Sequence, residues 1–409
     1  MGRAVQKINR REFLKKITAA ASSGAFIPFG SSLESQEQNF RVKNGDMYYR
    51  RLGSTGLFIS EISLGGSPVP DDPLLYRAVE RGVNYIDTSH NYMNGNSERK
   101  IGKLCRDVGR EKIHVATKFH LRGKWSKKSI IESVNGSLKR LQSDYIDILL
   151  IHGAEDEKQL TDERLLEAFE ELKKEGKYMF RGLSCHSNHH RVVKRAVECG
   201  YYDMVQLAYN VFDIRESEKK IKVYDDYLGE SGTRHLISFA HSRDVGIIAM
   251  KVLKVGGKRQ NIEKYRTGTT SLYQAMLKWA LENRKISSVV TEMLTYKQLE
   301  EDLAVVGTPL SEEEKKTLFR YVAESSTDYC HMCGDCEISC PSGIKTTVIL
   351  RYLSYYESYD KKERAIKAYA RLKPSQTALS CQDCGQCEKE CLYAVAVRRR
   401  IREAHSLLH

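Results

Sequence analysis

Residues 129–151 read SIIESVNGSLKRLQSDYIDILLI, which places a helical pattern directly before a strand pattern. The run 146–151 is short and mainly apolar, as expected of a buried strand. The run 129–141 is amphipathic, with apolar side chains at helical spacing at Ile130, Ile131, Val134, Leu138 and Leu141. The segment therefore predicts one helix followed by one strand, and similar units recur along most of the chain.

Strands and helices alternate in this way from about residue 61 to residue 306. Apolar runs of strand length lie at 59–64, 85–88, 113–119, 146–151, 181–185, 204–208, 246–251 and 288–291. Amphipathic helical runs lie between them, including 164–174 and 271–281. Eight such units predict an α/β fold, a (β/α)8 TIM barrel over residues 47–308. An open doubly wound sheet is the alternative, but no G-x-G-x-x-G follows any of these strands.

Chemically active side chains lie where three successive predicted strands end. Asp87 ends the second strand, with Tyr92 shortly after it, Lys118 ends the third, and His152 follows the fourth. Barrel active sites are built at the C-terminal ends of the strands. An isolated Asp, Lys or His has many structural roles, but four such residues at adjacent strand ends predict an active site.

At these positions the sequence resembles the aldo-keto reductase superfamily, across roughly residues 47–307. The resemblance rests on YIDTSHNYMNGNSE at 85–98, VATKFH at 115–120 and DYIDILLIHG at 144–153. It implies the catalytic tetrad of that family at Asp87, Tyr92, Lys118 and His152. It also implies an enzyme that reduces or oxidises the carbonyl or alcohol group of a small, sugar-like substrate.

The residue types of the tetrad suit that chemistry. Reduction of a carbonyl needs a proton at oxygen, and Tyr92 is the expected general acid. We expect the Lys118 ammonium, paired with Asp87, to lower the pKa of the Tyr92 phenol from its free value near 10. We expect His152 to donate a hydrogen bond that orients the carbonyl oxygen.

The resemblance places nicotinamide- and adenine-binding positions at Ser184, Gln206, Met250, Gln298 and Glu301. Three features depart from the family pattern. Cys185 replaces an Asn, Met250 replaces a stacking aromatic, and Lys297 is the only cation between residues 291 and 298. NAD, NADP and no stable nicotinamide therefore all stay open, and the absence of an Arg weakens the case for NADP.

Two runs of four cysteines follow the barrel: Cys330, Cys333, Cys336 and Cys340, then Cys381, Cys384, Cys387 and Cys391. Both have the spacing C-x2-C-x2-C-x3-C, and together they hold eight of the 11 cysteines. This spacing predicts two [4Fe–4S] clusters. A zinc site or a disulfide framework is a weaker interpretation, because zinc knuckles lie farther apart and closely spaced cysteines rarely bridge well.

In two-cluster proteins the fourth cysteine of each run commonly ligates the other cluster. We therefore expect Cys391 to complete the cluster of the first run and Cys340 to complete that of the second. The stretch 346–372 between the runs lacks Gly and Pro and shows helical periodicity. Residues 309–409 are thus predicted to form a mainly helical dicluster ferredoxin-like domain.

The N-terminus carries paired arginines in NRREFLK at 9–15, before a weakly apolar run at 17–29. This resembles a twin-arginine signal, which we assign to residues 1–38. It predicts export of the folded protein to the periplasm or cell envelope; an ordinary amphipathic basic segment is the alternative. No segment is apolar enough for a durable bilayer span, so we expect a protein that is not integral to the membrane.

The chain of 409 residues carries a net charge of +13. Part of this charge lies in a basic C-terminal tail, which we interpret as solvated. An anionic lipid surface or an acidic electron-transfer partner is the alternative explanation. No nucleic-acid-binding motif supports a nucleic-acid partner.

The sequence as a whole predicts an exported oxidoreductase whose clusters exchange electrons with a redox partner protein. A second hypothesis is an electron-transfer protein whose barrel is only a docking scaffold. The retention of all four tetrad residues favours the first hypothesis. One difficulty stays open: nicotinamides move two electrons as hydride, whereas clusters move one at a time, and no flavin motif bridges them. Either the clusters are not coupled to the tetrad or the chemistry departs from the family norm, and purely structural clusters are a third, lesser hypothesis.

Overall fold

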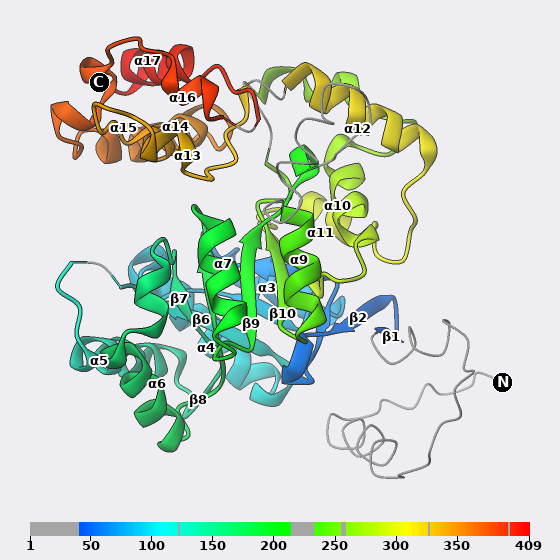
Figure 1. The fold of residues 1–409 in the computed structure, drawn as a ribbon. Coiled ribbons are helices and arrows are strands. Elements are labelled where there is room, and N and C mark those ends of the chain that lie inside the picture. The colour runs from blue at the N-terminus through cyan, green and yellow to red at the C-terminus, as the bar shows by residue number, and fades with distance from the viewer. Residues whose placement is uncertain (1–40, 122, 214–232, 255–258, 326–327, 392) are drawn as a thin grey trace, which may run out of the picture.

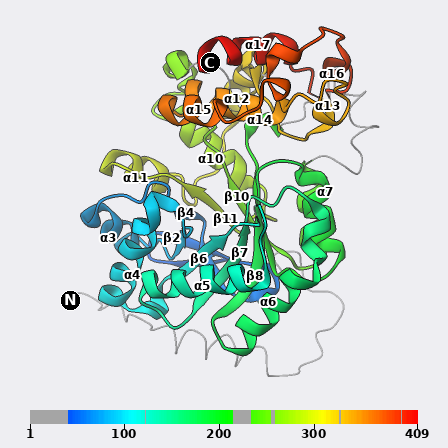
Figure 2. The same ribbon diagram turned by 90° about the vertical axis from the view of Figure 1, so that its left-hand side faces the viewer.

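The computed structural model describes residues 41–409, apart from residues 122, 214–232, 255–258, 326–327 and 392. A strand barrel surrounded by helices forms one part, and a group of C-terminal helices lies over one end of it (Figure 1). The perpendicular view shows the same stacking of the two parts (Figure 2). The predicted signal segment, residues 1–38, lies outside the described residues.

Parallel strands close the barrel in the order β10-β11-β4-β5-β6-β7-β8-β9. Their bounds are β4 Ile62–Gly65, β5 Tyr85–Asp87, β6 His114–Phe119, β7 Ile146–His152, β8 Tyr178–Cys185, β9 Met204–Ala208, β10 Gly246–Met250 and β11 Ser288–Thr291. Because all eight strands are parallel, their C-terminal ends meet at one rim. The predicted barrel is confirmed, and its closure excludes the open sheet.

Helices that follow the strands surround the barrel: α3 Asp72–Glu80, α4 Asn96–Val108, α5 Lys127–Leu141, α6 Glu163–Lys174, α7 His189–Glu198, α9 Thr233–Ser242, α10 Leu272–Glu282 and α11 Tyr296–Leu303. Helix α5 shows why these segments are helical. The Ser126 hydroxyl accepts a hydrogen bond from the Ser129 amide at 3.2 Å, which caps the first turn. Gln142 ends the helix in the left-handed conformation, at φ 50°.

An antiparallel sheet of β1 Arg41–Asn44, β2 Met47–Arg51 and β3 Phe58–Ser60 precedes the barrel. The predicted strand 59–64 is therefore wrong as a single element, because β3 pairs with β2 and the barrel strand β4 begins at Ile62. Leu52 and Ile59 of this sheet and its turn pack with Ile148 in the barrel interior. The hairpin thus fills the end of the barrel opposite the catalytic rim.

A buried ion pair holds the hairpin against the barrel. The Arg50 guanidinium lies 2.7 Å from Glu61, and both side chains are almost fully buried. Arg50 also donates to the carbonyl oxygens of Leu281 and Ile286, at 2.7 and 2.8 Å. Burial favours the neutral acid, but hydrogen bonds and charges from Arg41 and Arg50 outweigh it and lower the pKa of Glu61.

We predict that Glu61→Ala lowers the free energy of unfolding by about 3–5 kcal/mol, because it leaves the Arg50 charge buried without its partner. Denaturant titration followed by circular dichroism measures the change. Glu80→Ala is the control, because Glu80 pairs with Arg77 at the exposed surface, where a pair contributes about 0–1 kcal/mol. Equal effects of the two substitutions would contradict the prediction.

The C-terminal helices are α12 Glu312–Ser325, α13 Asp335–Ile338, α14 Thr346–Glu357, α15 Lys362–Tyr369, α16 Gln386–Lys389 and α17 Val397–Leu408. Helix α12 packs its Leu318 and Tyr321 into the core of the barrel. Helices α14, α15 and α17 share a separate core, which includes Ile349, Leu353 and Ile401. The predicted helical stretch between the cysteine runs forms α14 and α15.

The two cysteine runs fold as a repeat. Met332 and Asp383, which precede the second cysteine of each run, have φ 59° and φ 58°. Gly334 and Gly385, which follow it, have φ 96° and φ 74°. In both copies a glutamate after the third cysteine accepts a hydrogen bond from the first turn of the next long helix. Glu337 accepts from the Thr347 amide at 3.2 Å, and Glu388 from that of Arg398 at 3.0 Å.

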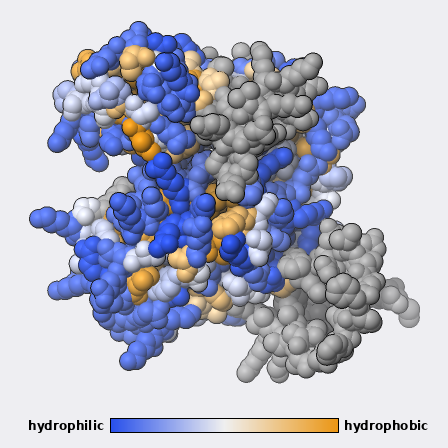
Figure 3. Space-filling model, in the orientation of Figure 1, coloured by the Kyte–Doolittle hydropathy of each residue, from blue (hydrophilic) through white to orange (hydrophobic). Residues whose placement is uncertain are grey.

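The surface seen in the orientation of Figure 1 is mainly hydrophilic, with small separate hydrophobic areas (Figure 3). Among the residues that the structure describes, no helix combines the length and apolarity needed to span a bilayer.

Candidate functional site

The four predicted catalytic residues meet at the C-terminal rim of the barrel. Asp87, Lys118 and His152 lie at the ends of β5, β6 and β7, and Tyr92 begins the short helix η2, Tyr92–Gly95. The Lys118 Nζ lies 2.6 Å from Asp87 Oδ1 and donates to the Thr88 carbonyl oxygen at 2.6 Å. The Tyr92 hydroxyl lies 3.5 Å from His152 Nε2. The structure therefore brings all four side chains into one site.

A strained turn presents Tyr92. Met93 and Asn94 follow it with φ 51° and φ 54°, in the left-handed region that side chains with a Cβ rarely adopt. Gly95 continues this conformation at φ 83°. Three consecutive left-handed residues turn the chain sharply between β5 and α4, so the tyrosine ring is directed to the rim.

Burial dominates the protonation of the site. It lowers the pKa of Lys118 and raises that of Asp87, and the mutual attraction of the pair opposes both shifts. Burial, then the charge of Lys118 and those of neighbouring histidines, lower the pKa of His152 well below 6.5. His152 is therefore a neutral imidazole at neutral pH.

The expected lowering of the pKa of Tyr92 is wrong in direction. Burial and the Asp87 carboxylate raise the pKa of the Tyr92 hydroxyl well above 10. The ammonium of Lys118 lies 4.9 Å from the centre of the tyrosine ring. Tyr92 therefore keeps its proton at neutral pH, which is the form that a proton donor requires.

The predicted nicotinamide positions lie in the rim. The Ser184 hydroxyl accepts from the Gly153 amide at 3.1 Å, and Met250 is buried at the end of β10. Gln206 Oε1 is buried, and no described residue donates a hydrogen bond to it. An unpaired buried acceptor is costly, so Gln206 fits an incoming amide N–H such as that of a nicotinamide carboxamide.

The predicted adenine-side positions are engaged within the fold. Gln298 Oε1 accepts from the Leu294 amide at 2.9 Å, and Glu301 accepts from the Ser271 hydroxyl. Lys361 of the C-terminal helices pairs with Glu292, just after β11, at 3.4 Å. Among the described residues, those on the adenine side are already paired with one another and do not form a site for a 2′-phosphate. The rim therefore fits the nicotinamide end of a cofactor better than its adenosine end.

The C-terminal helices contact the catalytic rim directly. Arg351 of α14 donates to Glu155 at 3.0 Å, and the Asn188 amide donates to the Met332 carbonyl oxygen at 3.1 Å. Tyr355 and Arg364, on α14 and α15, both act electrostatically on the Tyr92 hydroxyl. The cluster-binding part of the chain therefore contacts loops at the catalytic rim.

Two lysines at this junction did not emerge from the sequence reasoning. Burial, and then the charge of Lys254, lower the pKa of Lys251 to about 7. Burial lowers the pKa of Lys254 to about 8, while the Cys330 sulfur opposes the shift. Lys251 ends the predicted strand 246–251 and Lys254 follows it, so both lie at its catalytic end, but their burial does not follow from a local pattern.

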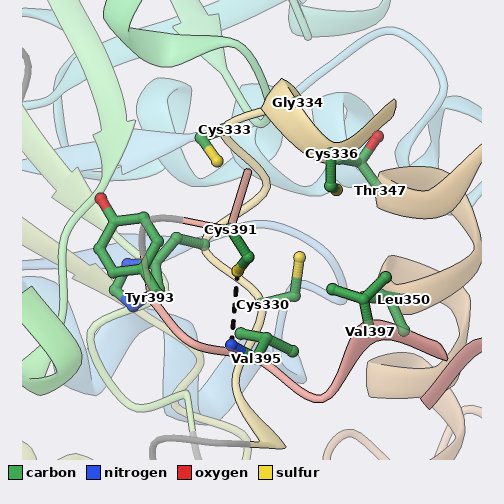
Figure 4. Close-up of a pocket in the computed structure, with 11 residues that line it drawn as sticks. Cys330, Cys333, Gly334, Cys336, Thr347, Leu350, Cys391, Tyr393, Val395 and Val397 are labelled. Carbon is green, nitrogen blue, oxygen red and sulfur yellow. Dashed lines mark hydrogen bonds between the residues drawn. The ribbon is translucent and has the colours of Figure 1, made fainter. Parts of the chain in front are cut away.

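The first predicted cluster site is a cavity among three cysteines of the first run and one of the second. Cys330, Cys333, Cys336 and Cys391 line it together with apolar side chains of α14 and α17 (Figure 4). The Cys330 sulfur accepts from the Met332 amide and the Cys391 sulfur from the Val395 amide, both at 3.4 Å. A cavity lined by four sulfurs, two of them facing amide donors, fits an iron–sulfur cluster.

The second predicted site also draws on cysteines of both runs. After burial and the charge of Glu388, Cys381 and Cys340 raise the pKa of the Cys387 thiol, so both lie within electrostatic range of it. Cys384 is exposed at the surface. Among the described residues, no three His, Cys, Asp or Glu side chains converge tightly enough to hold a single metal ion.

Comparison with known families matches both parts of the chain. A model of the aldo/keto reductase family matches residues 70–270. A model described as a 4Fe-4S dicluster domain matches residues 323–392, which contain all eight cysteines of the two runs.

The similar proteins include several oxidoreductases. The uncharacterized oxidoreductase YqkF of Bacillus subtilis is 29% identical over 299 residues, which cover 66% of this chain and 95% of that protein. The L-galactose dehydrogenase of Arabidopsis thaliana is 27% identical over 294 residues, 63% of this chain and 87% of that protein. The holo form of aldo-keto reductase AKR11C1 from Bacillus halodurans shares the fold, with a TM-score of 0.53 at 24% identity, covering 67% of this chain and 95% of that one.

The geometry of the rim agrees with the closed barrel, with the two family matches and with the oxidoreductase relatives. The chain is an aldo-keto reductase-type oxidoreductase that carries a 4Fe-4S dicluster domain.

Proposed function

We propose that the enzyme interconverts an alcohol and a carbonyl group on a small, sugar-like substrate at Tyr92, while two [4Fe–4S] clusters exchange the electrons with a redox partner. One observation carries the proposal: the dicluster domain contacts loops at the catalytic rim, where Arg351 donates to Glu155 and the Asn188 amide donates to Met332. A relative named L-galactose dehydrogenase supports a sugar-like substrate.

The electrons balance on this scheme. Oxidation of one secondary alcohol to a ketone breaks an O–H and a C–H bond and releases two electrons and two protons. Each bound cluster supplies a site that takes or gives one electron, so the pair matches one turnover. The chain's own residues manage the proton at oxygen: Tyr92 and His152 face it, and the Asp87–Lys118 pair fixes the charge beneath it.

Among the ends of a nicotinamide cofactor, the rim fits the nicotinamide end best. Ser184 and Gln206 would hold its carboxamide, and Met250 would pack against its ring. Gln298 and Glu301 would have to release their partners to reach an adenine. Without an Arg near the end of β11, we propose NAD rather than NADP when a nicotinamide binds.

The two cluster sites differ in their surroundings. The first lies next to the barrel, because Met332 of its loop bonds to Asn188 and Lys254 faces Cys330. The second includes the exposed Cys384. We therefore propose that electrons pass through the first site to the second and there to an acidic partner protein, which the basic chain attracts.

Tyr92→Phe removes the proton that the scheme transfers, so we predict a loss of rate of about 10²–10⁴-fold. Turnover is measured anaerobically on a panel of sugar alcohols and the matching carbonyl compounds, by following the visible absorption of the clusters. Tyr76→Phe is the matched control, because the Tyr76 hydroxyl on α3 donates to Asp107 on α4 at the exposed surface outside the barrel. Unchanged turnover in Tyr92→Phe would make the barrel a docking scaffold and the chain an electron-transfer protein.

Cys340→Ser tests the crossing of the ligands. We predict that it damages the cluster held by Cys381, Cys384 and Cys387 and leaves the one beside Cys330 intact, because Cys340 lies with Cys387. Iron content and electron paramagnetic resonance of the reduced protein separate the two clusters. Cys199→Ser is the control, since Cys199 lies in the barrel. Damage confined to the first-run cluster would reject the assignment.

We propose that the twin arginines, Arg10 and Arg11, direct export of the folded protein to the periplasm or cell envelope. Replacing both by Lys keeps the charge and removes the arginine pair, so we predict that the protein stays in the cytoplasm with its clusters. Cell fractionation and immunoblotting measure the distribution. Replacing Lys15 and Lys16 by Arg is the control, and export of the Arg10→Lys, Arg11→Lys variant at the normal level would reject the signal.

A further inference from the structure

A chain of hydrogen bonds starts and ends on His152, the histidine that faces Tyr92. Its first link is His120 Nδ1, 3.1 Å from the backbone carbonyl oxygen of His152. A carbonyl oxygen only accepts hydrogen bonds, so the proton of His120 lies on Nδ1. In a neutral imidazole the other nitrogen, Nε2, then carries a lone pair.

The next link fixes the orientation of an amide. Asn91 Nδ2 lies 3.1 Å from His120 Nε2 and only donates, which matches the lone pair there. The Asn91 Oδ1 therefore faces the other way, and the Ser89 hydroxyl donates to it at 2.9 Å. The reverse orientation would need protons on both nitrogens of His120, an imidazolium whose ring stacks on His152 at 4.2 Å.

The last link decides the state of His152. Because the Ser89 proton goes to Asn91, the Ser89 oxygen accepts from His152 Nδ1, 3.0 Å away. His152 Nε2 therefore carries a lone pair, and it faces the Tyr92 hydroxyl at 3.5 Å. The direction of every bond in the chain follows from one backbone carbonyl.

We infer that Ser89, Asn91 and His120 are positioning residues that hold His152 in the Nδ1–H tautomer, so that its Nε2 accepts a hydrogen bond from the Tyr92 hydroxyl. This replaces the expected role of His152 as a hydrogen-bond donor to the substrate carbonyl. The burial of His152 and its lowered pKa agree with a neutral ring that has one free lone pair.

The inference rests on the proposed function for its catalytic consequence. Because the Tyr92 O–H donates to His152 Nε2, the lone pairs of the Tyr92 oxygen are free to accept a hydrogen bond from a substrate alcohol. The tautomer of His152 thus sets which way the Tyr92 hydroxyl points when the alcohol binds.

Nitrogen-15 NMR of histidine-labelled protein reads the tautomer directly. In the full chain with oxidised clusters, we expect His152 to show a protonated Nδ1 and an unprotonated Nε2, with its signals assigned by their loss in His152→Gln. Ser89→Ala removes the acceptor for Nδ1–H, so a signal of protonated Nε2 should appear. A protonated Nε2 in the unsubstituted protein would overturn the inference.

Two substitutions of His120 separate the hydrogen bonds from ring packing. His120→Phe keeps an aromatic ring on His152 but removes both nitrogens, and we expect the fixed tautomer to be lost. His120→Gln offers one donor and one acceptor, and we expect it to retain the tautomer. His235→Phe, at an exposed position of α9, should leave His152 unchanged. Loss of the tautomer in none of the Ser89 and His120 variants would also overturn the inference.

The NMR measurement needs no turnover, so the two proposals fail separately. If His152 Nε2 is protonated and the Tyr92→Phe variant is slow, the assigned tautomer is rejected and the proposed reaction is kept. If His152 has the expected tautomer and the Tyr92→Phe variant is fully active, the tautomer is kept and the proposed reaction is rejected.

Discussion

The buried ion pair between Lys118 and Asp87 is the constraint on which the catalytic rim depends. A pair of charges removed from water is tolerated only with close partners, and here the partners are each other, at 2.6 Å, and the Thr88 carbonyl oxygen. The two side chains come from adjacent parallel strands, so strand register sets their separation. The Asp87–Lys118 pair thus forms the base of the site, and the side chains of Tyr92 and His152 lie next to it.

The dicluster domain changes the physics of this rim as well as adding clusters to it. Arg351 and Lys361 join it to Glu155 and Glu292 on separate barrel loops. Burial raises the pKa of Tyr92 and lowers that of Lys251, and charges from this domain add to both shifts, Tyr355 to the first and Arg351 to the second. The contact between the two parts of the chain thus also shifts the protonation of residues at the rim.

The barrel and the tetrad could be predicted because both follow from local patterns. Strand-length apolar runs gave the eight barrel strands, and position at a strand end brought Asp87, Lys118 and His152 together. The split of 59–64 into β3 and β4 was missed, because one apolar run spans both. The pKa of Tyr92 was predicted in the wrong direction, since burial at the rim comes partly from helices far along the chain.

The chain of hydrogen bonds that orients His152 could not be predicted from the sequence, for a different reason. Asn91 and His120 lie on different loops, and only their three-dimensional contact gives the hydrogen bonds a direction. Tyr92 keeps its proton, and the neutral His152 offers its Nε2 lone pair to the hydrogen bond that this proton makes. The two departures from expectation, a phenol that keeps its proton and a histidine that accepts a hydrogen bond, are therefore complementary. The side chains that orient His152 thus share in orienting the Tyr92 hydroxyl.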